Sequence, residues 1–322
     1  MKTLTVIGSL AALVLLMGQA SAAPVRHSEQ LVEGASRGNH ELDCTVIRPW
    51  TERSGPKDIL YPVIAWANGW DQGDVIGEIV LEGYKPGLIE WALDGPYIVI
   101  AANQWSVQES DVLQCIQWLV DQGNDEDSKY FERVNDEKIG LAGHSQGGGA
   151  VIKAGDGEPN NFDITAVVAM NPYGPSWVDP GNQDGPMMLL GGTEDTTTPV
   201  SSFIAVWDGV LDEESLSNGP GGLLAVIQGG SHNSEAWGVD AEGDTLPTLE
   251  AALFDFGRFQ RVTELWWQIF LNDRLGKARD LKRALDTDPW ITEATADFGP
   301  TTRYCIPALG SVDAGYLDDC LE

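Results

Sequence analysis

Short apolar runs recur along the chain and are separated by polar stretches. The runs occupy residues 44–49, 61–67, 97–102, 138–143, 164–171, 186–192 and 223–230. Most of their positions are apolar in succession, with no polar residue at every second place, and this pattern is typical of strands that are buried on both faces of a parallel sheet. We therefore predict a mostly parallel sheet at the centre of the fold.

The stretches between these runs carry the spacing of amphipathic helices. Within residues 108–122, the apolar residues Val112, Ile116 and Leu119 recur at intervals of three and four, so they share one face of a helix. A second apolar helix is predicted over residues 264–275, where it would cover one face of the sheet. Strands that alternate with helices indicate an α/β fold with helices on both faces of a mostly parallel sheet.

The mature chain reads as one domain from residue 23 to residue 322. We find no internal repeat and no low-complexity tract that would mark a domain boundary. Residues 277–300 are mixed and charged, and we interpret them as an extension that leads to a C-terminal tail.

The first 22 residues have the features of a secretory signal peptide. Lys2 precedes an apolar run over residues 4–17, which is too short to span a bilayer, and Ala20-Ser21-Ala22 follows it. We expect cleavage near Ala22 and a secreted or periplasmic protein. No later stretch is apolar enough to predict insertion into a membrane.

Acidic residues dominate the charge of the chain. Its 49 acidic and 19 basic residues give a formal net charge of −30. Such a charge repels phosphate backbones, so a nucleic acid is excluded as a partner, and we expect a soluble monomer.

Four cysteines in an exported chain indicate two disulfides, for which three pairings exist. We predict that Cys305 and Cys320 form a bridge that holds the tail. Cys44 and Cys115 would then join the first predicted strand to a helix, or they are two buried free thiols. Cys-x-x-Cys spacing and His/Cys clusters are absent from the sequence, so no metal site is predicted.

A Gly-x-Ser-x-Gly pentapeptide, residues 143–147, follows one of the apolar runs directly and precedes a helix-compatible stretch. A sharp turn from strand to helix at this motif exposes a serine hydroxyl at the carboxyl edge of the sheet. Ser145 is therefore the predicted nucleophile. The backbone N–H of Gln146, at the start of the helix, is predicted to face the oxyanion that forms.

A nucleophilic serine requires a base, and the chain contains four histidines. His27 borders the predicted cleavage site, His40 precedes the first predicted strand, and His144 is adjacent to the serine and should point away from it. His232 lies in a glycine-rich loop directly after the last apolar run, so we predict that His232 is the base.

A carboxylate must hold the base in the correct tautomer. Glu194 and Asp195 both follow the strand predicted over residues 186–192. Asp195 is preferred because it lies deeper in the turn, and Glu194 is the alternative. The resulting order of serine, acid and histidine along the chain is that of the α/β-hydrolase fold.

The loop after an early strand should supply the second donor of an oxyanion hole. Gly69 permits a close approach of the backbone, and the N–H of Trp70 can then point to the same place as that of Gln146. A buried tryptophan in a turn is the alternative interpretation of Trp70.

Several motifs together resemble the bacterial cutinases and polyester (PET) hydrolases, with chlorophyllase-like esterases close by. The motifs are PVIAWANGW, DEKIGLAGHSQGGG, MNPYGPSW, GGTEDTTTPV, QGGSHNS and the C-terminal cysteine pair, and the similarity extends roughly from residue 43 to residue 320. The resemblance implies the α/β-hydrolase fold and an acyl subsite lined by Trp70, Gln146 and Tyr173. Gln146 stands where methionine is common in the polyester hydrolases.

The sequence as a whole predicts a secreted serine ester hydrolase of the cutinase or polyesterase type that uses no cofactor and no metal. Its expected partner is an ester substrate, either polymeric or lipid-like. The alternatives are a lipase or general carboxylesterase, and a hydrolase-fold binding protein that has lost catalysis.

Overall fold

A computed structural model gives the structure of the chain, which is built around a central sheet covered by helices. The structure describes residues 26–37, 40–49, 59–69, 78–104, 106–156, 162–173, 183, 185–202, 221–232, 249–288 and 291–297. The predicted signal peptide, Trp70 and the Cys305–Cys320 bridge lie outside these residues.

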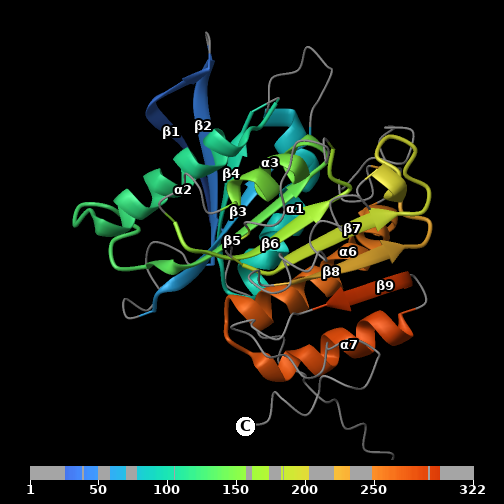
Figure 1. Cartoon of the computed structure of the whole chain (residues 1–322). Coiled ribbons are helices and arrows are strands. Elements are labelled where there is room, and N and C mark those ends of the chain that lie inside the picture. The colour runs from blue at the N-terminus through green and yellow to red at the C-terminus, as the bar shows by residue number, and fades with distance from the viewer. Residues whose placement is uncertain are drawn as a thin grey trace, which may run out of the picture.

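Nine strands form one sheet in the order β1-β2-β4-β3-β5-β6-β7-β8-β9 within the described part of the chain (Figure 1). The strands are β1 (Arg26–Arg37), β2 (His40–Arg48), β3 (Tyr61–Ala67), β4 (Ile98–Asn103), β5 (Val134–His144), β6 (Ile164–Met170), β7 (Met187–Gly192), β8 (Gly222–Ile227) and β9 (Ile291–Asp297). Pairing is parallel from β4 to β8 and antiparallel at the two ends, where β1 pairs with β2, β2 with β4, and β8 with β9. The prediction of a mostly parallel sheet is confirmed.

Helices cover both faces of the sheet, also as predicted. They are α1 (Glu78–Asp94), α2 (Glu109–Asn124), α3 (Gln146–Ala154), α6 (Leu249–Phe270) and α7 (Ala278–Thr287), with a 3₁₀ turn at Leu275–Lys277. Alternate residues of each central strand point to opposite faces. Val63 and Ala65 of β3 therefore pack with α2 and α3, whereas Ile64 and Trp66 pack with α1 and α6.

The core beneath α1 and α6 is rich in tryptophan. Trp91, Trp266 and Trp267 are fully buried, and the rings of Trp91 and Trp267 meet edge to face at 5.9 Å. Burying each such side chain contributes on the order of 2–3 kcal/mol. The two layers thus hold the central strands rigidly, and the carboxyl ends of β5 to β8 form one fixed edge.

Two strands at the ends of the sheet differ from the prediction. β1 precedes the run at residue 44 and pairs with β2, so the prediction that His40 lies ahead of the first strand is wrong, and His27 also lies within a strand. The predicted extension over residues 277–300 contains α7 and β9, and β9 lies beside α7 at one end of the sheet (Figure 1). Both end strands consist mostly of polar residues, so they lack the continuous apolar run of the central strands.

A disulfide joins Cys44 of β2 to Cys115 of α2, and both residues are buried. The bridge from a strand to a helix is therefore confirmed, and the alternative of two free thiols is wrong. Cys44 lies on the second strand of the sheet and not on the first, because β1 precedes it. The bridge closes a loop of 71 residues, which in a chain-entropy account stabilises the fold by about 4 kcal/mol.

No helix within the described residues is long and apolar enough to cross a membrane.

Candidate active site

Ser145 occupies a sharp turn between β5 and α3. Its backbone has φ 54° and ψ −121°, a left-handed conformation that costs free energy for any residue other than glycine. The turn is closed so tightly that a side chain on Gly147 would meet the carbonyl oxygen of Ala67 at 2.2 Å, and one on Gly143 would meet that of Gly147 at 2.4 Å. The glycines of the pentapeptide are therefore required by the shape of the turn.

Backbone hydrogen bonds hold this turn against the end of β6. The N–H of Ser145 donates to the carbonyl of Met170 at 3.0 Å, and the carbonyl of Ser145 accepts from the N–H of Tyr173 at 2.8 Å. The neighbouring loop after β3 also lies close, because a side chain on Gly69 would meet Ser145 Cβ at 3.2 Å. The serine thus lies at the carboxyl edge of the sheet, where ligands bind in open α/β folds.

His232 follows β8 and reaches the serine from the neighbouring loop. Its Nε2 lies 2.9 Å from Ser145 Oγ, and its Nδ1 lies 2.8 Å from Asp195 Oδ2. The structure therefore brings together the predicted nucleophile, base and acid, which are far apart in the sequence. A carboxylate on Nδ1 leaves Nε2 free of its proton, so Nε2 can accept the proton of the serine hydroxyl.

Asp195 follows β7 and is buried, with its carboxylate fully surrounded by donors. Oδ1 accepts from the backbone N–H groups of Thr197 and Thr198, each at 2.8 Å, and Oδ2 accepts from the Thr198 hydroxyl at 2.7 Å. Burial raises the pKa of Asp195, but the hydrogen bonds from His232 and Thr198 outweigh it and the net pKa is lowered. The neighbouring Glu194 is exposed, and Asp195 is the carboxylate that contacts His232.

His144 lies fully buried beside His232, and its ring nitrogens have other partners than the serine. Nδ1 lies 2.6 Å from the hydroxyl of Tyr84, and Nε2 lies 2.5 Å from the backbone carbonyl of His232. Because a carbonyl can only accept, Nε2 carries the proton and Nδ1 accepts from the tyrosine. Burial, and after it the nearby His232, lower the pKa of His144 to about 3.

The residues predicted to line a subsite have different degrees of exposure. Tyr173 is 54% exposed next to the serine turn, and Gln146 is partly exposed at the first position of α3. The Gln146 side chain donates to Ser106 Oγ at 2.9 Å, so a polar contact fixes it against the loop after β4.

Two polar residues of the site were missed by the sequence analysis. Thr198 and Asn171 are both buried, and Thr198 Oγ1 lies 3.0 Å from His232 Nδ1 as well as from the carbonyl of Asn171. The only sequence signal was position, since Asn171 ends the run over residues 164–171 and Thr198 stands in the segment after the run over residues 186–192. Polar residues at such places are common in ordinary turns, which is why the pattern did not single them out.

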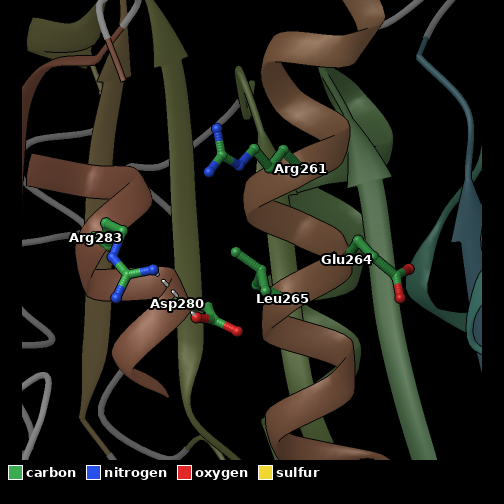
Figure 2. Close-up of a pocket in the computed structure, with 5 residues that line it drawn as sticks. All are labelled: Arg261, Glu264, Leu265, Asp280 and Arg283. Atoms are coloured by element: carbon green, nitrogen blue, oxygen red, sulfur yellow. Dashed lines mark ion pairs between the residues drawn. The ribbon is translucent and has the colours of Figure 1, made fainter. Parts of the chain in front are cut away.

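A pocket of about 260 Å³ lies between α6 and α7, and no member of the serine, histidine and aspartate trio lines it (Figure 2). Its walls are made by Arg261, Glu264, Leu265, Asp280 and Arg283. The arginines have acidic neighbours, with Arg283 4.0 Å from Asp280 and Arg261 3.7 Å from Asp288, and they are largely exposed. Exposed pairs of this kind contribute little stability and form a solvated surface.

Among the described residues, no group of three or more His, Cys, Asp or Glu side chains is placed to hold a metal ion.

Residues 97–234 match the family model described as PET hydrolase-like. The matched stretch runs from the start of β4 to the loop after β8, so it includes Ser145, Asp195 and His232. Together with the sheet and helices described above, the match identifies the α/β-hydrolase fold, and the predicted resemblance to PET hydrolases is confirmed. No curated protein matches the chain in sequence.

Proposed function

We propose that the protein is a secreted serine ester hydrolase in which Ser145, His232 and Asp195 form the catalytic triad. One observation carries this proposal: the continuous pair of hydrogen bonds from Ser145 Oγ through the His232 ring to the Asp195 carboxylate. The match to the PET hydrolase-like family supports it independently.

The reaction would proceed as acyl transfer in two steps. His232 Nε2 takes the proton of Ser145 Oγ as this oxygen attacks the ester carbonyl, and the carboxylate of Asp195 stabilises the imidazolium that forms. His232 then gives the proton to the alcohol oxygen, which leaves, while the acyl group stays on the serine. A water molecule, deprotonated by His232, attacks the acyl carbon, and His232 then returns this proton to Ser145 Oγ as the bond to the acyl group breaks and the acid leaves. No step in this sequence requires a metal or an organic cofactor.

The negative charge on the tetrahedral intermediate requires preorganised donors. The backbone N–H of Gln146 stands at the N-terminus of α3, where the helix dipole favours an anion. We assign the second donor to the backbone N–H of Trp70, because the preceding residue Gly69 lies against the serine turn. This pair would contribute roughly 3–4 kcal/mol per donor to the transition state.

We propose a polyester or cutin as the substrate class, with Trp70, Gln146 and Tyr173 around the acyl group. The exposed ring of Tyr173, whose own N–H bonds the carbonyl of Ser145, supports an apolar or aromatic acyl group at this place. Stacking of two aromatic rings adds about 1 kcal/mol to the burial of their area.

The Ser145→Ala variant tests the catalytic assignment. We expect it to lose release of p-nitrophenol from a short-chain ester by roughly 10⁴-fold or more, because no other group can form the acyl-enzyme. The matched control is Ser110→Ala, an exposed serine in the first turn of α2, which should keep the rate of the parent. A folded Ser145→Ala protein that turns over the ester at the parent's rate would refute the assignment.

A product assay on a polyester film tests the substrate class. The film is incubated beside soluble esters and triglycerides, and soluble aromatic acid is measured by chromatography. Aromatic acid from the film that Ser145→Ala does not release supports a polyesterase. Activity on triglycerides or soluble esters alone would instead identify a lipase or general carboxylesterase, and binding to esters without turnover would identify a catalytically inactive protein.

A further inference from the structure

The short segment at residues 170–173, which begins with the last residue of β6, touches all three loops of the candidate triad. It bonds the serine turn through the carbonyl of Met170 and the N–H of Tyr173, as described above. Its second residue, Asn171, bonds both other loops. No member of the segment belongs to the triad itself.

The side chain of Asn171 bridges the loop of the acid and the loop of the base. Its Oδ1 accepts from the N–H of Gly192 at 3.0 Å, three residues before Asp195. Its Nδ2 donates to the carbonyl of Ser231 at 3.2 Å, the residue directly before His232. The orientation of the amide is fixed by these neighbours, because an N–H must face the oxygen and a carbonyl must face the NH₂ group.

The backbone of Asn171 also faces the acid side. Its N–H donates to the carbonyl of Leu190 in β7 at 2.7 Å, and its carbonyl oxygen lies 3.0 Å from Thr198 Oγ1. The same Thr198 oxygen lies 2.7 Å from Asp195 Oδ2. The residue is fully buried and has φ 42°, a left-handed conformation that asparagine tolerates better than most residues.

We propose that Asn171 is a positioning residue that holds the loops of Asp195 and His232 in register with each other and with the turn of Ser145. The role as a positioning residue rests on the proposed function, since it acts only through the triad. None of the four bonds and contacts given above joins it to Ser145 Oγ or to His232 Nε2. Its bonds fix where the His232 ring stands between the carboxylate and the serine hydroxyl.

An amide is required at this place because one of its two partners, the N–H of Gly192, is a donor and the other, the carbonyl of Ser231, is an acceptor. An apolar side chain would leave the buried N–H of Gly192 and the buried carbonyl of Ser231 without this partner, which costs about 1–3 kcal/mol for each group. An ionised aspartate would keep the acceptor for Gly192 but set a carboxylate oxygen against the Ser231 carbonyl. The loop of His232 would then be pushed away from the loop of Asp195.

The test uses Asn171→Gly, which removes the amide and keeps the left-handed backbone. We expect kcat for a short-chain p-nitrophenyl ester to fall roughly 10- to 100-fold, since a displacement of about 1 Å at reacting groups costs this much. KM should stay within about twofold of the parent, because no residue proposed for the subsite is substituted.

The matched control is Thr165→Val, which removes a buried hydroxyl near the opposite end of strand β6. It should keep the parent's kcat even where it lowers the melting temperature.

A spectroscopic signature separates positioning from general stability. The N–H proton between His232 Nδ1 and Asp195 should give a low-field proton NMR signal in the parent and in Thr165→Val, and this signal should shift or vanish in Asn171→Gly. Asn171→Asp serves as the second variant if the glycine variant does not fold. At pH 8 it should show the same fall in kcat and the same change in the low-field signal. A folded variant with the parent's kcat and an unchanged low-field signal would overturn the proposal.

The signal also separates this inference from the proposed function. If the parent hydrolyses no ester, the proposed function fails, but the NMR comparison still decides the placement of His232. A signal lost only in the Asn171 variants then supports the positioning role, whereas an identical signal in all proteins refutes it.

Discussion

His144 and His232 are neighbours whose rings lie 4.8 Å apart, yet their surroundings differ in kind. His232 stands between a hydroxyl and a carboxylate, with part of its side chain exposed to solvent. His144 stands between a tyrosine hydroxyl and a backbone carbonyl, and it is fully buried. The comparison shows how partners, and not residue type, decide what an imidazole can do.

The difference lies in which ring can carry a second proton. An imidazolium at His232 is stabilised by the charge of Asp195, which itself is held ionised by four hydrogen bonds. An imidazolium at His144 would have to donate from Nδ1 to a tyrosine oxygen, in a fully buried place beside the ring of His232. Its neutral form is therefore favoured, and it bonds the backbone carbonyl of His232, the residue proposed as the base.

The largest expected effect comes from exchanging each histidine for glutamine. His232→Gln should lower kcat/KM roughly 10⁴- to 10⁶-fold, because the proposed general base is lost. His144→Gln should lower it less than about 100-fold, since an amide N–H can still donate to the His232 carbonyl. Steady-state kinetics on a short-chain ester measure both. Equal losses in the two folded variants would mean that His144 itself transfers the proton, and the contrast drawn above would be wrong.

The sequence allowed the meeting of Ser145, Asp195 and His232 to be predicted because each follows an apolar run. Parallel strands that lie near one another must end at the same edge of the sheet, so residues directly after them are brought close. The glycines around Ser145 added a local signal, since only a sharp turn needs them there. Both arguments depend on near neighbours in sequence and on the rules of parallel sheets.

Contacts between loops and the last strand of the sheet could not be predicted from the sequence in this way. The bonds of Asn171 and Thr198 depend on distances between loops from different strands, which no local pattern encodes. Strand β9 was missed because it pairs with β8 at the end of the sheet and carries only three apolar residues, Ile291, Ala294 and Ala296, among its seven positions. The predicted mixed extension was in fact a helix and the last strand of the sheet.

A smaller effect is expected in the pH dependence of stability. His144 has a folded pKa of about 3 and an ordinary pKa of 6.5, so between these values the unfolded chain binds a proton that the folded protein does not. The contribution of His144 to the free energy of unfolding is constant above pH 6.5. It is lost as the pH falls from about 6.5 towards 3, by about 1.4 kcal/mol per pH unit. Urea unfolding of the parent at pH 7, 6 and 5 should show this slope.

The His144→Gln variant is the control for that slope, because glutamine does not titrate. Asp195, whose pKa is also lowered, loses its contribution only below its ordinary value of 3.8, so it lies outside the window measured. The variant should therefore lose less stability than the parent between pH 7 and pH 5. Identical slopes in the two proteins would show that His144 accepts a proton in the folded state.

The smallest expected effect concerns the hydroxyl that faces His144. Tyr84→Phe leaves the ring packed against Trp66, whose centroid lies 5.0 Å away, but removes the partner of His144 Nδ1. A buried nitrogen without its donor should lower the free energy of unfolding by about 1–3 kcal/mol, as measured by urea unfolding at pH 8. Because Nε2 still donates to the His232 carbonyl, kcat should change by less than about tenfold.

The matched control for this hydroxyl is Tyr97→Phe, which removes another buried tyrosine oxygen that accepts from Asn272 at 2.9 Å. This tyrosine packs with α1 and α6 in the core. Both variants should lose stability at pH 8. Only Tyr84→Phe should change the slope with pH, because an imidazole that has lost a donor at Nδ1 is protonated there more easily. A slope that changes equally in both variants would show that the tyrosine does not fix the neutral form of His144.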